Sequence, residues 1–210
     1  QLLEQGADPA IQDKKEKNTP LILATVKCYT HAVRALLERM TPPMVNITNS
    51  EGVPALLHAT ANGDVDTVKA LIQGGADVNY TLDLSRVPNT SSNTSIYPTA
   101  LMIALYKAYP HCAKFLLQAG ANPNIEDRNG TTALHIAAQI GTWPEVMRLL
   151  LQKGAHVNKK DKHGRTALYY LVMGGECMST DNNIEIIVKA GGKLNELCEG
   201  SNNLLQLALI

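Results

Sequence analysis

The sequence predicts an all-α solenoid, in which repeated helix-turn-helix units stack side by side, and three observations support this prediction. First, the chain of 210 residues contains one Phe and one Trp, so its core must consist mainly of Leu, Ile, Val and Ala, as in closely packed helices. Second, a short motif returns at intervals of 33 to 45 residues. Third, another motif returns in step with it.

The first motif predicts the start of a helix in each repeat. Residues 162–168 read Lys-His-Gly-Arg-Thr-Ala-Leu and echo residues 128–134, which read Arg-Asn-Gly-Thr-Thr-Ala-Leu. The offset between Thr132 and Thr166 is 34 residues, and the other copies begin at Thr19, Pro54, Thr99 and, weakly, Asn202. A Thr hydroxyl can accept a hydrogen bond from an unpaired amide at a helix start, and Pro suits the first helical position.

The second motif predicts the end of a helix. It reads Gly-Ala followed by Asp, Asn or His, and its copies begin at Gly6, Gly75, Gly120 and Gly154. Glycine can adopt the left-handed conformation that ends a helix. Between the two motifs a small residue, such as Gly63 or Gly141, interrupts the apolar spacing, so each repeat must hold two helices.

New caps are expected after these interruptions. Asp64 can cap a second helix that begins at Val65. Thr142 and Glu145 match the Thr-x-x-Glu capping box, with Pro144 near the first turn. The predicted unit is therefore helix, turn, helix and then a loop.

This pattern resembles the ankyrin repeat, and the best match runs from Asp127 to Asn158. The family residues in it are Gly130, Thr132, Leu134, His135, Ala137, Ala138, Gly141, Leu149, Leu150, Gly154, Ala155 and Asn158. The resemblance covers essentially the whole chain and implies β-hairpin-like loops, about five full repeats and partial repeats at both ends. The implied divisions of this single domain are 1–13 (partial), 14–49, 50–80, 81–127 (with an inserted loop at about 81–97), 128–161, 162–197 (with a stretched loop between its helices) and 198–210 (partial).

Several repeats depart from the family pattern. Repeat one has Pro42 and Pro43 where Gly-Ala is expected, so we expect its second helix to end in a turn fixed by proline. In repeat two His58 falls one position late. Because end repeats normally carry polar caps and the chain begins and ends within a repeat, we expect the natural protein to continue in both directions.

Composition and motifs narrow the classes of function. Nineteen basic and nineteen acidic residues give no global field that would attract nucleic acid or an anionic membrane. The four cysteines lack the spacing of a zinc site, and no apolar run is long enough to span a membrane. The common nucleotide, hydrolase, metalloprotease and calcium motifs are absent from the sequence. We therefore expect no catalysis, metal, cofactor, nucleic-acid partner or membrane insertion, and a cytoplasmic location, with the nucleus as the alternative.

The resemblance implies that a protein partner binds the concave face, which combines hairpin tips with the exposed side of the first helices. The family's contact positions, carried over one repeat at a time, give Tyr97, Tyr106, Lys107, Arg128, Asn129, Gln139, Ile140, Lys162, His163 and Arg165. Tyr106, Ile140 and Arg165 are the preferred anchors, since aromatic and Arg side chains supply much of the energy of interfaces. Basic residues gather at hairpins four and five, which favours an acidic partner there; an ordinary solvated face is the alternative.

The resemblance also assigns roles to His135 and to three loop asparagines. His135 is expected to bond backbone and link neighbouring loops. Asn79, Asn124 and Asn158 match positions that are hydroxylated in some ankyrin proteins, and the alternative is that they bond the loop backbone.

The leading hypothesis is thus a protein-interaction module of a larger scaffold, signalling regulator or ubiquitin-ligase substrate adaptor. The alternative is a targeting or regulatory arm of a larger enzyme, channel or toxin whose active part lies outside these residues.

Overall fold

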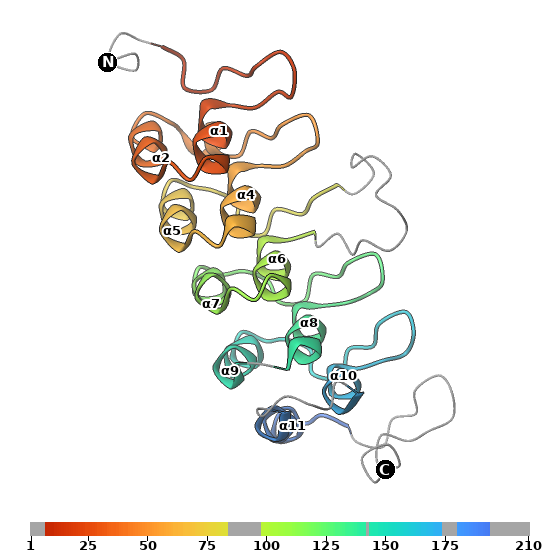
Figure 1. Ribbon diagram of the computed structural model, residues 1–210. Coiled ribbons are helices and arrows are strands. Elements are labelled where there is room, and N and C mark those ends of the chain that lie inside the picture. Colours follow the sequence, from red (N-terminus) through yellow and green to blue (C-terminus); the bar gives the residue numbers. More distant parts are fainter. Residues whose placement is uncertain (1–6, 84–97, 142, 174–179, 194–210) are drawn as a thin grey trace.

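A stack of helix pairs makes up the computed structural model, which describes residues 7–83, 98–141, 143–173 and 180–193 (Figure 1). The first helices of the pairs are α1 (Pro20–Val26), α4 (Ala55–Asn62), α6 (Ala100–Tyr106), α8 (Ala133–Ile140) and α10 (Ala167–Met173). The second helices are α2 (Thr30–Leu37), α5 (Val65–Gln73), α7 (Pro110–Gln118), α9 (Pro144–Gln152) and α11 (Thr180–Lys189). A short helix, α3 (Pro42–Val45), follows the first pair.

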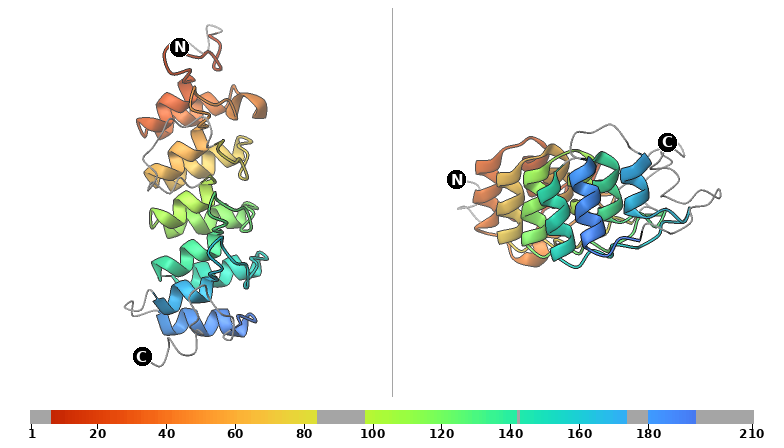
Figure 2. Two further views of the ribbon diagram at one scale, coloured as in Figure 1. Left: turned by 90° about the vertical axis from the view of Figure 1, so that its right-hand side faces the viewer. Right: turned by 90° about the horizontal axis from the view of Figure 1, so that it is seen from below.

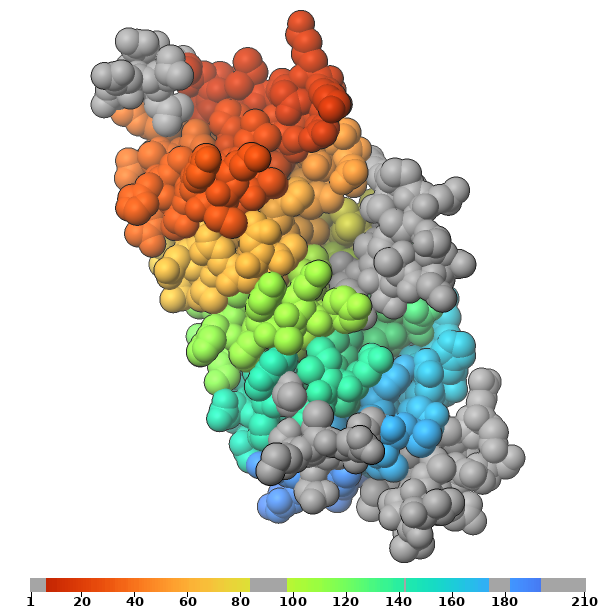
Figure 3. Space-filling view, viewed as in Figure 1, coloured from red at the N-terminus to blue at the C-terminus, as the bar shows by residue number. Residues whose placement is uncertain are grey.

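The helices form two layers, with the loops extending to one side (Figure 2). In one layer α1 contacts α4, α4 contacts α6, α6 contacts α8 and α8 contacts α10. In the other layer α2, α5, α7, α9 and α11 contact one another in the same order. Figure 3 shows the repeats as successive bands of colour along the molecule. The predicted all-α repeat architecture is confirmed.

The core consists of small and branched aliphatic side chains at repeating positions. The Ala and Leu of the first motif are almost completely buried in each described repeat that carries the pair: Ala55, Leu56, Ala100, Leu101, Ala133, Leu134, Ala167 and Leu168. Because Ala has only one side-chain carbon, neighbouring helices can approach closely while Leu fills the space between them. The motif therefore specifies both the start of a helix and its contact with the next repeat.

Most predicted caps are present, and one is wrong. Thr19 accepts a hydrogen bond from the Ile22 amide at 3.2 Å, and Asp64 caps α5 by accepting from the Thr67 amide at 3.0 Å. The predicted capping box placed the N-cap at Thr142, which lies outside the described residues, but α9 begins at Pro144 with Trp143 as its N-cap, and Trp143 makes no side-chain cap bond. Glu145 consequently lies one position too early for the reciprocal bond.

The left-handed conformation predicted for the glycines of the Gly-Ala motif is present at the copies that the structure describes, and the glycines that end the first helices adopt it too. Gly63 and Gly141 have φ values of 72° and 69°. At the equivalent positions of repeats one and three, Cys28 and Ala108 have φ values of 57° and 62°. A residue with a Cβ is strained in this region by about 1–2 kcal/mol. Two of the repeats therefore hold a backbone that suits glycine better than the residue present.

The prolines of repeat one do not end its second helix. Helix α2 stops at Leu37, and Pro42 and Pro43 instead occupy the first positions of α3. A proline in the first turn lacks only an amide that has no intrahelical partner, so it favours a helix start there. The predicted proline turn was wrong in this respect.

The two irregular segments are described only at their edges. The amide of Leu82 donates to the carbonyl of Pro98 at 2.8 Å, so the ends of the insertion meet. Most of the insertion, including Tyr97, and the stretch at 174–179 lie outside the described residues.

Candidate partner-binding surface

The described hairpin loops, those of repeats one, two, four and five, are each built around one acidic or amide side chain. Asp127 accepts hydrogen bonds from the amides of Asn129 and Thr131, both at 2.8 Å. Asn49 and Asp161 make equivalent bonds in their own loops. The carboxylate or amide thereby holds the turn internally and leaves the tip residues directed away from it.

Neighbouring hairpins are joined through their backbones. The Ser50 amide donates to the Glu16 carbonyl at 2.8 Å, and the Lys162 amide donates to the Asn129 carbonyl at 2.8 Å. Hairpins one and two, and hairpins four and five, therefore form continuous rims.

The loop asparagines clamp each repeat to the next. The side chain of Asn124 donates to the Gly154 carbonyl at 2.8 Å and accepts from the His156 amide at 2.9 Å. The same pair of bonds is made by Asn46, Asn79 and Asn158. The expected backbone-bonding role is thus present. The fourth clamp, Asn46, was missed, although its spacing of 33 residues from Asn79 could have revealed it.

His135 has the structural role that was expected. Its Nδ1 accepts from the Thr132 amide at 3.1 Å, and its Nε2 lies 3.1 Å from the Arg165 carbonyl. Because a carbonyl oxygen only accepts, Nε2 carries the proton. Burial lowers the pKa of this imidazole against the raising effect of the Arg165 carbonyl, so the ring is neutral at physiological pH.

The sequence did not reveal a buried polar cluster around Asp161. This carboxylate is fully buried and accepts bonds from the Tyr170 hydroxyl at 2.7 Å and from Arg165 Nε at 2.9 Å. The guanidinium of Arg165 also lies 5.0 Å from the centre of the Tyr170 ring. Burial alone would raise the pKa of Asp161, but the hydrogen bonds outweigh it and hold that pKa below its usual value.

This cluster changes the role of Arg165. Its side chain is 31% exposed and is engaged by Asp161 and Tyr170, so it supports the fifth hairpin from within. Arg165, which the sequence suggested as an anchor for a partner, therefore already makes interactions within the domain.

We use the name loop-side face for the hairpin tips together with the last turns of the first helices and the residues that follow them. The helix residues included in this definition are Leu23, Val26, Lys27, Ala61, Asn62, Tyr106, Lys107, Gln139, Ile140 and Met173. A cavity of about 450 Å³ that is lined by Val26, Lys27 and residues of two hairpins shows that this side of α1 faces the loops. Tyr106 is 53% exposed, Lys107 and Gln139 are exposed, and Ile140 is half-buried against the core.

The basic tips of hairpins four and five remain open. Arg128, Lys162 and His163 are exposed, and no ion pair to any of them occurs in the described part of the chain. Lys159, by contrast, pairs with Glu126 at 2.7 Å. Within the described residues, the rim therefore presents three exposed basic side chains that make no ion pair.

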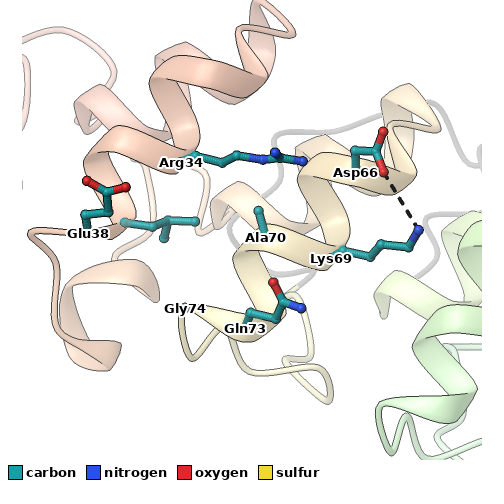
Figure 4. A pocket seen from close by; sticks show the side chains of 8 residues that line it. Arg34, Glu38, Asp66, Lys69, Ala70, Gln73 and Gly74 are labelled. Carbon is teal, nitrogen blue, oxygen red and sulfur yellow. Dashed lines mark ion pairs between the residues drawn. The ribbon is translucent and has the colours of Figure 1, made fainter.

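A second groove lies on the side of the second helices, between α2 and α5 (Figure 4). It has a volume of about 590 Å³, and Arg34 extends into it from α2. On the opposite wall Lys69 pairs with Asp66 at 3.7 Å. This groove is distinct from the loop-side face.

The repeat family is decided by comparison with known sequences. The family described as ankyrin repeats (3 copies) matches residues 1–81 and 101–196. The chain belongs to the ankyrin repeat family. Ankyrin repeats are protein–protein interaction modules, and the described part of this ankyrin chain contains no group of side chains that could hold a metal ion.

Known proteins of several kinds are similar to parts of the chain. An E3 ubiquitin-protein ligase KEG from Arabidopsis thaliana is 35% identical over 56% of the chain, and an ankyrin repeat and SOCS box protein 16 from Homo sapiens is 31% identical over 61%. An intracellular phospholipase A2 from Caenorhabditis elegans is 28% identical over 55%. The matches cover only 6%, 25% and 11% of these relatives, respectively. None of the helices described in this ankyrin chain is long and apolar enough to cross a membrane.

Proposed function

We propose that this ankyrin domain serves a larger protein as its docking module and binds a partner protein on the loop-side face. The observation that carries the proposal is the open basic rim at hairpins four and five. The loop carboxylate of Asp127 accepts hydrogen bonds within its own turn, whereas exposed Arg128 and Lys162 make no ion pair with any residue that the structure describes.

The chemistry of this rim favours an acidic partner segment. Two cations and a histidine lie on adjacent hairpins whose backbones are joined by the Lys162 amide and the Asn129 carbonyl. Exposed Lys107 and Gln139 extend the polar surface onto the first helices, and Tyr106 supplies an aromatic contact. Rim charges of this kind raise association rates and orient the partner.

The test is selection of displayed random peptides on the immobilised chain. We expect enrichment of Asp and Glu, and loss of these peptides from the Arg128→Glu/Lys162→Glu variant. The matched control is Arg39→Glu/Lys153→Glu, which reverses two exposed cations outside the loop-side face. If both variants select acidic peptides equally, with unchanged helicity and melting temperature, the rim is not part of the binding site.

As the role of the larger protein, we favour a scaffold, a signalling regulator or a ubiquitin-ligase substrate adaptor in the cytoplasm or nucleus. The ubiquitin ligase and the SOCS box protein among the relatives support this choice. The phospholipase among them supports the second candidate, a regulatory arm of an enzyme whose active part lies elsewhere. The sequence of the full-length natural protein distinguishes the two.

Hydroxylation of Asn79, Asn124 and Asn158 is a separate proposal. Each of these side-chain amides is held by the next loop, so a modifying enzyme would have to open a clamp to reach its target. Mass spectrometry of the protein isolated from its own cells tests this modification.

A further inference from the structure

The cavity between hairpins one and two has a composition different from that of the basic rim. It holds about 450 Å³ and is lined by Glu16, Asn18, Leu23, Val26, Lys27, Asn49, Ser50, Glu51 and His58. The lysines at the tip of the first hairpin, Lys14, Lys15 and Lys17, are not part of this lining.

The floor of the cavity is aliphatic. Leu23 and Val26, one turn apart on α1, are 44% and 45% exposed. Most large apolar side chains described on the first helices are buried or half-buried, and these two share their exposure with Tyr106 and Met173. Such a floor fits the methylene stem of a long side chain.

Two carboxylates from adjacent hairpins stand above this floor. Glu16 is held by the side-chain amide of Asn18, which donates to Oε2 at 2.9 Å and is itself 7% exposed. Glu51 lies on the next hairpin, which the Ser50 amide ties to the Glu16 carbonyl. The hairpins that carry the two acids are therefore fixed relative to each other.

The remaining polar groups leave the cavity acidic. Lys27 contributes one ammonium against the two carboxylates. Burial lowers the pKa of His58, against the raising effect of Glu51, so the imidazole adds no positive charge at physiological pH. In addition, the Nε2 atom of His58 is buried and has no hydrogen-bond partner among the residues that the structure describes.

We infer that this cavity receives an arginine side chain of the partner, with its stem on Leu23 and Val26 and its guanidinium between Glu16 and Glu51. Arginine suits the site because its planar group offers several N–H donors that can bond two carboxylates at once. The inference rests on the proposed docking function and adds that the partner is basic at hairpins one and two but acidic at hairpins four and five. This opposition of charge fixes the direction in which the partner lies along the repeats.

The experiment is an NMR titration of the ¹⁵N-labelled 210-residue chain with N-acetyl-arginine amide. We expect saturable shifts of the amide signals of Lys27, Glu51 and their neighbours. N-acetyl-norleucine amide, which keeps the stem without the charge, should bind more weakly, and N-acetyl-glutamate amide should not bind there.

Substitutions then locate the charge recognition. Glu16→Gln and Glu51→Gln should each weaken arginine binding about fivefold, the scale of one exposed ion pair. Glu38→Gln, in the groove of the second helices, is the matched control. Scattered shifts, equal binding of norleucine, or unchanged binding by both variants with intact spectra would overturn the inference.

The outcomes also separate this inference from the proposed function. Arg128→Glu/Lys162→Glu should leave the arginine titration unchanged. If that titration fails while acidic peptides are still selected at the rim, only the arginine pocket is refuted. Failure of both experiments refutes the docking function as well.

Discussion

Two residues that follow first helices, Cys28 and Ala108, have a left-handed backbone conformation that is strained for any residue with a Cβ. Ala108 has a φ of 62° at the position where Gly141 has 69°. Ala108→Gly should raise the free energy of unfolding by about 0.5–1 kcal/mol, because relief of the Cβ clash exceeds the added entropy of the unfolded chain. Urea denaturation measures this difference. The reverse substitution, Gly141→Ala, should lower the free energy of unfolding by about 1 kcal/mol. Stabilisation by this variant would contradict the explanation.

Asp161 should dominate the acid sensitivity of the fifth repeat. Since its folded pKa is lowered, its contribution to stability is present at neutral pH and is lost as the pH falls below about 4, the usual unfolded pKa. Asp161→Asn should reduce the free energy of unfolding at pH 7 by about 2–4 kcal/mol and flatten its acid decline. Glu38→Gln is the exposed control. Urea denaturation at a series of pH values from 7 to 2 measures this decline. If the free energy of unfolding of Asp161→Asn falls with pH as steeply as that of the wild type, Asp161 is not the source of the acid sensitivity.

Sequence motifs could predict some of these residue roles but not others. His135 lies at a position with a recurring spacing and made the contacts expected of it. Arg165 also lies at a recurring position, but its engagement depends on Tyr170, which is a neighbour only after α10 has folded against the hairpin. Contacts of this kind have no local signal in the sequence.

At the scale of elements, the asparagine clamps should stabilise contacts between repeats. Asn124→Ala removes two hydrogen bonds to the following loop. The amide of His156 and the carbonyl of Gly154 then lose their partner. We expect a loss of about 1–3 kcal/mol in the free energy of unfolding. Asn129→Ala is the control, because its exposed side chain makes no such clamp, and it should change stability by less than about 0.5 kcal/mol. Equal effects in thermal denaturation would argue against the clamp.

Helix starts and ends were largely predictable, because the interactions that fix them are local. Thr19, Asp64 and Gly75 perform their capping or terminating roles within a few residues of their own positions. The errors arose where several residues compete for one role. At the start of α9, Pro144 takes the first helical position, so the N-cap is Trp143 and not the residue before it, as the Thr-x-x-Glu pattern had predicted.

Across the whole molecule, burial is uneven, and stability should follow it. Helix α2 buries only Val33, whereas α7 buries Cys112, Ala113, Leu116 and Leu117. In a repeat stack, local opening depends on the contacts of each unit with its neighbours. Amide hydrogens of α2 should therefore exchange about tenfold faster than those of α7, as native-state exchange with NMR detection can measure. Equal protection would mean that the described repeats open together.

The architecture could be predicted from repetition, because it follows from the order of the units, and the location proposed for the binding surface rests on the same order. The chemistry of that surface could not be predicted. The acidic cavity combines Glu16, Leu23 and Glu51, three residues on three elements, and no motif relates them. The basic rim was visible as a cluster in the sequence, but which of its charges are paired depended on the fold.

The clamp made by Asn124 and its counterparts ends on main-chain atoms of the adjoining loop. Every amino acid except proline carries both a backbone amide N–H and a carbonyl, so the asparagine clamp requires almost nothing of the side chains in the repeat that it holds. Over evolutionary time, a unit can be duplicated, deleted or exchanged while the clamp keeps the same chemistry. The surface side chains that arrive with each exchanged unit can then alter recognition without redesign of the junctions.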